Sequence, residues 1–433
     1  MIKVIPTAIL LVILLFSVAC DNALPEADVE DCLFLEDLDY MMWVLESNFP
    51  FWGVAYRDRG VDIAEIFDDV RTTIRNADDM TEIEFNNLLI DSFRPLRGIA
   101  HFSISRRFRE ATSDGVPPFA AMLTEEFMVD PNFVRQRLYD LVGQELAELF
   151  IEALQNNDVS EIVRLNELVL SKIESRENVN TEIIEDGRIA YLSVASFAVP
   201  NYREHIEEQQ IFNFFEEIQD FEHLIIDLRR NPGGSLFYPL EQLIRPLVHD
   251  THIVDAFVFV NDSECVLAFA PPDGRWRFMG PLFTEIENEL HPIYEMLQKY
   301  DLPELNDLDA ERLSYGFRVS VRLFPRPAIQ STFTGKIWLL TSYFTGSAAQ
   351  VATWLFKESG LATLVGDVTA GYFGGTSIRR YLPNTGIPFI FDVLYITDHN
   401  GRPLEAGTIP HHFNRPGMDS METVLALIAE GEY

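Results

Sequence analysis

Hydrophobic positions divide the chain into a helical front part and a part in which strands and helices alternate. Between residues 32 and 106, apolar side chains repeat at helical spacing, as at Leu38, Met42 and Leu45. Residues 107–186 are richer in charge but keep a helical pattern. We therefore expect a small N-terminal helical domain at residues 32–106 and a helical insertion or linker at residues 107–186.

From residue 187 the pattern changes to that of strands alternating with helices. The apolar runs at residues 223–228 and 336–341 are typical of buried strands. Helical patterns near residues 202–220 and 236–247 follow strands. This alternation predicts an α/β core at residues 187–433.

The first residues have the pattern of an export signal. Lys3 precedes an apolar run at residues 9–16, and small residues then lead to Cys20. Small residues before a cysteine resemble the lipobox of bacterial lipoproteins. The resemblance implies that residues 1–20 are a signal peptide, that Cys20 is lipidated, and that the protein is extracytoplasmic and lipid-anchored to the bacterial cell membrane. The alternative is an ordinary cleaved signal. A spanning helix is disfavoured because the apolar run is shorter than the roughly 20 residues that a bilayer requires.

Composition indicates a tether after the signal and limits the kinds of partner and the cysteine chemistry that we expect. Residues 21–31 are polar and acidic, as expected of a tether. The net charge of −35 argues against nucleic-acid binding, which needs a basic surface. If Cys20 is lipidated, Cys32 and Cys265 remain. They could pair in an oxidising compartment, but two buried free thiols are the interpretation we favour.

Ser347 is the candidate nucleophile. It lies at the predicted start of a helix, among free backbone N–H groups and at the positive end of the helix dipole. The strand at residues 223–228 ends in a turn with Gly233 and Gly234, where a substrate carbonyl can approach the backbone closely. The N–H groups of Gly233 or Gly234 and of Ala348 would form an oxyanion hole. The alternatives are a helix-capping serine and glycines that only make a tight turn.

Three segments in chain order resemble the C-terminal processing, or tail-specific, serine peptidases (the S41 peptidase family), which include the tricorn protease core and the repeats of interphotoreceptor retinoid-binding protein. They are GRIAYLSVASF, HLIIDLRRNPGG and TSYFTGSAAQVATWLFKESGLATLVGDVTAG. The stretch FWGVAYRDRGVDIAEIFDDV, leading to LRGIAHFSI, resembles the helical domain before the core in many bacterial members. The resemblance covers most of residues 187–410 and implies a Clp-protease/crotonase-like α/β fold.

The resemblance also implies a base for Ser347, which falls where the family has its nucleophile. One branch uses a lysine after a Thr-x-Gly segment, but Tyr372 stands at that position here. The tricorn-like branch uses a histidine from the domain before the core, and His101 matches it, although Ile99 and Ala100 replace the frequent Asp-Gly. A serine hydroxyl needs a base to become nucleophilic. We therefore expect His101 to be the base; a structural histidine is the alternative.

The segment around Glu405 resembles the family's Glu-x-Gly-Val-x-Pro-Asp segment, which implies that Glu405 orients or polarises the site; a surface glutamate is the alternative. His411 and His412 lack a third ligand at a recognisable spacing, so we expect no metal and no cofactor.

The expected function is a serine-type peptidase that cleaves extracytoplasmic proteins or peptides. There are two alternatives. One is a binding protein for apolar ligands or peptides on the same fold, and the other is an exported scaffold that keeps an ancestral core. The pattern of residues does not define the oligomeric state.

Overall fold

The computed structural model describes residues 27–104, 135, 138–139, 142–156, 158–174, 177–199, 201–263, 285–286, 290–373, 375 and 377–431. Cys20 and Cys265 lie outside these residues, so the predictions of a signal peptide, a lipid anchor and a pairing of cysteines stay predictions. Among the described helices, none combines the length and the apolar character needed to cross a membrane.

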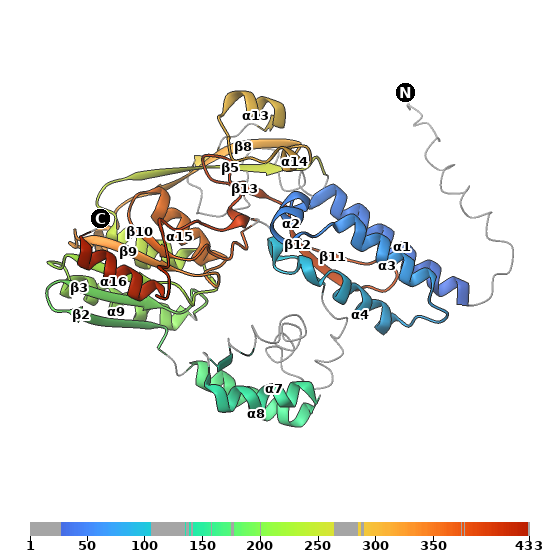
Figure 1. Ribbon diagram of the computed structural model, residues 1–433, viewed down its shortest axis with the longest axis horizontal. Helices are drawn as coiled ribbons and strands as arrows, with labels where there is room; N and C mark the ends of the chain where they lie inside the picture. The colour runs from blue at the N-terminus through green and yellow to red at the C-terminus, as the bar shows by residue number, and fades with distance from the viewer. Residues whose placement is uncertain are drawn as a thin grey trace, which may run out of the picture.

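A six-stranded sheet forms the centre of the C-terminal part (Figure 1). Its strand order is β14-β10-β9-β4-β3-β2, and all neighbours are parallel except the edge pair β2–β3. The strands are β2 (Val179–Glu185), β3 (Ile189–Val194), β4 (His223–Asp227), β9 (Lys336–Thr341), β10 (Thr363–Gly366) and β14 (His412–Phe413). Every residue of β4 is buried, as its continuous apolar run predicts.

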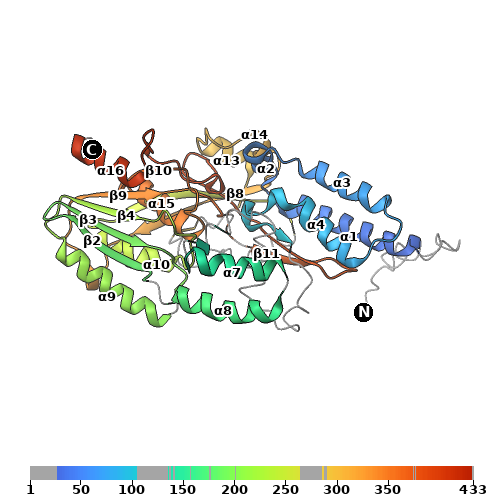
Figure 2. The same cartoon turned by 60° about the horizontal axis from the view of Figure 1, so that its bottom comes forward.

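Helices cover both faces of this sheet, and Figure 2 shows α9 and α16 on opposite sides of it. Ile225, Trp338 and Val365 pack against α16, whereas Leu224 and Leu339 face the main core. Neighbouring strand residues therefore point to opposite faces, as strand geometry requires. The helical elements of this part are α9 (Asn201–Glu217), α10 (Phe237–Pro239), the π-helical turn η3 (Leu240–Ile244), α11 (Arg245–Leu247), α15 (Ala348–Glu358), η6 (Leu404–Ala406) and α16 (Ser420–Glu430).

Two smaller sheets lie beside the main sheet. One has the order β13-β5-β8-β6, with β7 also paired to β8; the other has the order β1-β12-β11. Their strands are β1 (Ser103–Ile104), β5 (His252–Val260), β6 (Glu285–Ile286), β7 (His291–Pro292), β8 (Tyr315–Leu323), β11 (Ser377–Tyr381), β12 (Pro388–Asp392) and β13 (Tyr395–Thr397). The helical segments α13 (Ile293–Lys299), α14 (Asp307–Ala310) and η5 (Pro327–Ile329) accompany them.

The N-terminal helices pack together next to β11 and β12, away from β2 and β3 (Figure 1). They are α1 (Ala27–Asn48), α2 (Trp52–Arg59), α3 (Ile63–Arg75), α4 (Glu82–Ser92), η1 (Arg94–Leu96) and η2 (Ile99–His101). Thr81 and Glu84 form a reciprocal capping box that starts α4, and the Asp62 side chain caps α3. Buried Asp37 accepts hydrogen bonds from the backbone N–H groups of Asn384 and Thr385, which joins α1 to the turn between β11 and β12.

The predicted α/β core with a helical N-terminal region is confirmed. Within the predicted insertion at residues 107–186, α7 (Gln144–Gln155) and α8 (Val159–Glu174) pack on each other through a small core of their own. Strand β2 also falls inside that range, and α1 begins inside the predicted tether at residues 21–31.

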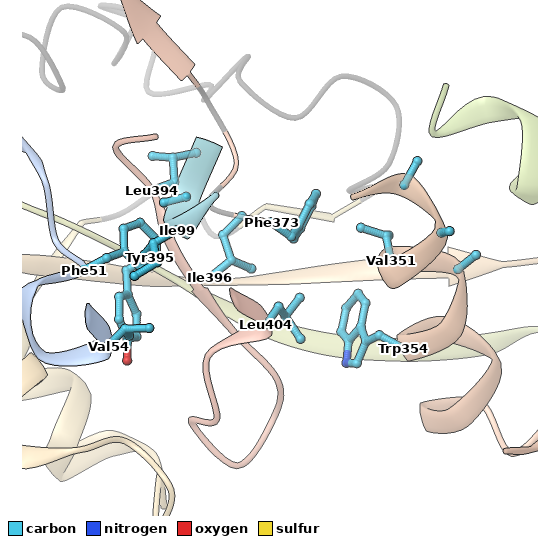
Figure 3. Packing of buried hydrophobic residues seen from close by; sticks show 14 of the residues in the cluster. Phe51, Val54, Ile99, Val351, Trp354, Phe373, Leu394, Tyr395, Ile396 and Leu404 are labelled. Carbon is cyan, nitrogen blue, oxygen red and sulfur yellow. The ribbon is translucent and has the colours of Figure 1, made fainter. Parts of the chain in front are cut away.

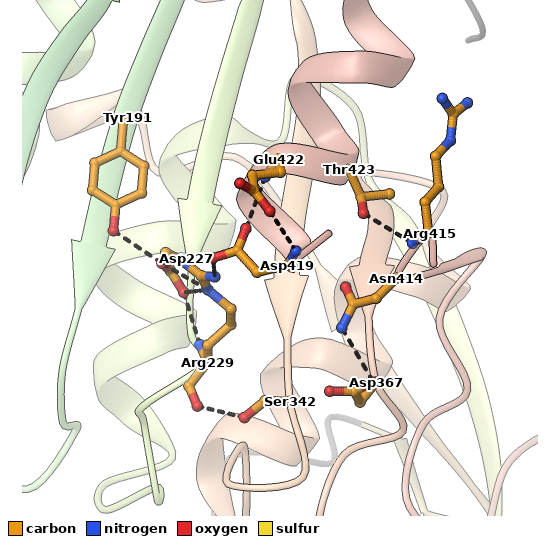
Figure 4. A network of polar contacts seen from close by, with 10 residues as sticks. All are labelled: Tyr191, Asp227, Arg229, Ser342, Asp367, Asn414, Arg415, Asp419, Glu422 and Thr423. Carbon is orange, nitrogen blue, oxygen red and sulfur yellow. Dashed lines mark hydrogen bonds and ion pairs between the residues drawn. The ribbon is translucent and has the colours of Figure 1, made fainter. Parts of the chain in front are cut away.

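The end of β4 is fastened to the C-terminal helix by a polar network (Figure 4). The Arg229 guanidinium donates hydrogen bonds to Asp227 and, over 3.1 Å, to Asp419, the residue that caps α16. The Ser342 hydroxyl donates to the Arg229 carbonyl over 2.5 Å, which adds the turn after β9. Three segments distant in sequence are thereby held together directly beside the two turns that follow β4 and β9.

Candidate active site

Ser347 lies between β9 and α15 in a conformation that amino acids with a side chain rarely adopt. Its φ is 51° and its ψ is −121°, and its side chain makes no capping hydrogen bond to α15. The backbone N–H of Ser347 donates to the Gly371 carbonyl over 3.0 Å. The hydroxyl is therefore not engaged as a helix cap, although Ser347 occupies the capping position.

Gly233 lies directly against the Ser347 turn. A Cβ atom on Gly233 would be 2.7 Å from the Gly346 carbonyl oxygen and 2.8 Å from the backbone nitrogen of Ala348. Only glycine fits, because its φ of 105° also favours a residue without a side chain. The Gly233 N–H donates to Asn231 Oδ1 over 2.9 Å and is thus already engaged. Among the described residues, no acceptor takes the N–H groups of Gly234 or Ala348.

The two turns are held together by hydrogen bonds. The Asn231 side-chain amide donates to the Val194 carbonyl over 3.0 Å, and the Gly346 N–H donates to the Asn231 carbonyl over 3.2 Å. The Thr345 hydroxyl donates to the Leu228 carbonyl over 2.9 Å. These buried bonds fix the glycine turn after β4 relative to the serine turn after β9.

His101 ends η2 and is held by a carboxylate from β12. Its Nδ1 lies 2.6 Å from Asp392 Oδ2. The His101 side chain is 41% exposed, whereas the Asp392 side chain is fully buried. Partial burial lowers the pKa of His101, but the hydrogen bond and charge of Asp392, together with the charge of Glu405, outweigh it and leave this pKa raised. Among the described residues, no partner engages Nε2.

Glu405 is buried and joins the histidine segment to the segment after Gly371. Its Oε1 accepts a hydrogen bond from the Ala100 N–H, and its Oε2 accepts one from the Phe373 N–H, each over 2.8 Å. Burial raises the pKa of Glu405 to about 8, although these two hydrogen bonds act in the opposite direction.

Tyr372 lies between the histidine segment and the serine turn. A Cβ on Gly98 would be 2.5 Å from Tyr372 Cε1, and a Cβ on Gly346 would be 2.9 Å from Tyr372 Cδ2. The ring centroids of His101 and Tyr372 are 6.5 Å apart. Since Cε1 and Cδ2 are on opposite edges of the ring, Tyr372 separates these two backbone segments.

Ala100, His101, Ser347 and Tyr372 are the non-glycine residues with positive φ in the described part of the chain, at 48°, 52°, 51° and 58°. Each such conformation costs on the order of 1–3 kcal/mol and persists only where the surroundings enforce it. The neighbouring residues Ile99, Phe373 and Leu404 are buried in the main core, which supplies this enforcement (Figure 3). Backbone strain is thus concentrated where the predicted site residues lie.

The structure brings several predicted site residues to this region: Ser347, Ala348, Gly233, Gly234, His101 and Glu405. Asp392 was not among the site residues predicted from the sequence. Its signal was a carboxylate inside the apolar run at residues 388–395, where an unpartnered charge would be costly. His411 Nδ1 accepts from the Leu364 N–H over 2.9 Å, and the described residues contain no cluster of three or more potential metal ligands.

Comparison with known proteins identifies the family. The model of Peptidase family S41 matches residues 188–413, just over half of the chain. A candidate peptidase from Parabacteroides merdae has a similar structure, with a TM-score of 0.53 and 15% identity over 94% of this chain and 97% of that one. Mature CPAF complexed with lactacystin is also similar, with a TM-score of 0.50 and 14% identity over 88% of this chain and 94% of that one.

The chain therefore belongs to peptidase family S41 and is a serine peptidase. The family resemblance of the three sequence segments is confirmed, and so is the α/β fold that it implies.

Proposed function

We propose that the protein is a processing protease of extracytoplasmic proteins in which Ser347 is the nucleophile and His101 is the general base. The Ser347 hydroxyl is not used as a helix cap, and His101 is held at Nδ1 so that Nε2 remains for proton transfer. Both residues lie next to Tyr372 and are joined through Glu405, Phe373 and Gly371.

The proposed reaction is acyl transfer in two steps. Ser347 Oγ attacks the carbonyl carbon of the scissile bond while its proton passes to His101 Nε2. The N–H groups of Ala348 and Gly234 stabilise the negative oxygen, and Gly233 contributes by having no side chain. The carbon–nitrogen bond then breaks, and the amine leaves with the proton from His101. Water hydrolyses the acyl-enzyme with His101 again acting as the base.

One observation carries the proposal: the strained non-glycine residues gather at the predicted nucleophile and base. Ala100, His101, Ser347 and Tyr372 come from two regions more than two hundred residues apart. Strain of this kind persists where function requires a fixed geometry.

The extracytoplasmic part of the proposal rests on the export pattern at residues 1–20. We propose lipidation of Cys20, which would attach the protein to the cell membrane through residues 21–26. In cells, the wild-type chain should partition into the membrane fraction, and Cys20→Ser should release it to the soluble extracytoplasmic fraction. Retention of Cys20→Ser in the membrane would contradict the anchor.

The catalytic part is tested with the full chain in detergent. Wild type should cleave an unfolded protein substrate and react with a fluorophosphonate probe. Ser347→Ala should lose both reactions, with a fall in cleavage rate on the order of 10³-fold or more. Ser359→Ala is the matched control because Ser359 follows α15 at its other end, where its hydroxyl donates to the Leu355 carbonyl. It should keep full activity and labelling.

Lactacystin is a second probe, since mature CPAF forms a complex with it. Wild-type cleavage should be inhibited, and mass spectrometry should locate any adduct at Ser347. Retained cleavage by purified Ser347→Ala would overturn the assignment of the nucleophile. Absence of both cleavage and labelling in the wild type would favour the apolar-ligand-binding alternative.

A further inference from the structure

The small sheet β1-β12-β11 places a carboxylate beside the proposed base. In the antiparallel pair β1–β12, Ser103 lies opposite Ile390. Continuing this register by two residues puts His101 opposite Asp392, although His101 itself belongs to η2. Cross-strand neighbours of this kind have side chains close enough to interact. The His101 Nδ1–Asp392 Oδ2 distance of 2.6 Å agrees with that register.

The third strand fixes the other oxygen of the same carboxylate. Ser377 of β11 lies opposite Asp392, and its hydroxyl donates a hydrogen bond to Asp392 Oδ1. The Asp392 side chain is fully buried, so its position depends on these partners. Asp392 is therefore held between Ser377 on one strand and His101 beyond the end of the other.

Glu405, the carboxylate that the resemblance assigns to the site, makes different contacts. Its two oxygens accept hydrogen bonds from backbone N–H groups, Oε1 from Ala100 and Oε2 from Phe373. It thus fixes the backbone next to His101, while Asp392 contacts the imidazole ring itself.

We propose that Asp392 is the positioning residue of the imidazole, holding the His101 proton on Nδ1 and leaving Nε2 as the base, whereas Glu405 fixes the backbone on either side of the site. This inference rests on the proposed function, because it assigns the group through which His101 acts on Ser347. An aspartate that fixes the tautomer of a catalytic histidine is worth on the order of 10⁴ in kcat in a serine peptidase of unrelated fold.

Asp392→Asn tests the proposal because the side chain keeps its size but its amide can donate to Nδ1. The proton would then move to Nε2, the nitrogen that must accept from Ser347. We expect kcat to fall by about 10²- to 10⁴-fold with KM changed less than threefold. Asp392 also raises the pKa of His101, so the acid limb of the kcat/KM profile should move to lower pH in this variant.

Glu405→Gln is the matched comparison. Among the described residues, Asp392, Glu405 and Tyr372 are the titratable groups that face His101, so both carboxyl variants are measured over the same pH range. We expect Glu405→Gln to shift the acid limb less than Asp392→Asn does. The inference would be overturned if Asp392→Asn kept the wild-type kcat and acid limb while Glu405→Gln shifted the acid limb.

A measurement on the wild type covers the case in which Asp392→Asn fails to fold. In the chain labelled with ¹⁵N-histidine, the His101 signals are assigned by their loss in His101→Ala. Neutral His101 should carry its proton on Nδ1; a proton on Nε2 would overturn the inference. If Ser347→Ala and His101→Ala retain cleavage, the proposed function fails instead, whatever Asp392→Asn does.

Discussion

Gly233 faces Ser347 across two turns that are more than one hundred residues apart in sequence, so closely that a Cβ on Gly233 would be 2.8 Å from Ser347 Cβ. The same atom would be 2.8 Å from the Ala348 nitrogen, one of the two proposed oxyanion donors. The absence of a side chain at residue 233 is therefore a requirement of the site as well as of its turn.

Gly233→Ala should separate the two turns. The added methyl group must displace the Ala348 N–H or the Ser347 side chain, so we expect kcat to fall on the order of 100-fold or more, as when one oxyanion donor is lost. Gly187→Ala is the control, because Gly187 also has a positive φ but nothing lies within 4 Å of its Cβ position. It should lose about 1 kcal/mol of stability and keep its activity. Equal activity in both variants would contradict this account.

Tyr372 should act through its ring. Tyr372→Ala removes the group that separates Gly98 from Gly346, so the His101 segment can shift relative to Ser347. We expect kcat to fall at least about tenfold, since misplacement of about 1 Å can cost 10²-fold. Tyr372→Phe keeps the ring and should retain most of the activity. Steady-state cleavage of one peptide by both variants measures the difference; similar losses in both would assign the effect to the hydroxyl.

Glu405 should make stability depend on pH. Its pKa is about 8 in the folded chain against 4.5 for an ordinary glutamate, so the folded state binds the proton more tightly. Its contribution to the unfolding free energy is therefore largest below about pH 4.5 and declines as pH rises toward 8, by on the order of a few kcal/mol. Glu405→Gln should lose this decline. Thermal unfolding at pH 5 and pH 8 measures it; an identical change of Tm with pH in both proteins would be the contrary result.

Arg57 should matter for stability because it joins the N-terminal helices to the rest of the chain. Its guanidinium makes two hydrogen bonds to Asp309, a fully buried carboxylate that also accepts from the Tyr395 hydroxyl. Arg57→Leu leaves that charge without its cation and should cost about 3–5 kcal/mol in denaturant unfolding. Arg164→Leu breaks a solvent-exposed pair with Glu161 on α8 and should leave the unfolding free energy almost unchanged. Similar losses of unfolding free energy in the two variants would show that the buried pair contributes no more than the exposed one.

The sequence predicts the core of the fold well where local pattern and burial agree. The strands at residues 223–228 and 336–341 were found because both of their faces are buried, and α15 was found because its apolar face follows a glycine turn. The helix predicted near residues 236–247 is present, but Pro239 and Pro246 lie in a segment that changes from α-helix to π-helix and back. Local pattern predicts that a helix exists but not this change in its winding.

The candidate site was predicted less completely because part of it depends on long-range pairing. Ser347 and the glycine turn have local signals, and His101 required the family resemblance. No local pattern identifies the partner of Asp392, because its contact with His101, 291 residues away in sequence, depends on the pairing of β1 with β12. The bond between the Gly233 N–H and Asn231 is a property of the folded turn and cannot be read from the glycines alone.

Under the proposed function, the pairing of β1 with β12 also sets the point in synthesis at which His101 can act as the base. A ribosome makes residues 103–104 early and residues 388–392 near the end of the chain, so His101 lacks its buried partner until nearly all of the protein has been made. An exported polypeptide emerges in the same order. Because the proposed base gains its partner this late, we expect the newly made chain to be unable to cut itself while it is still unfolded.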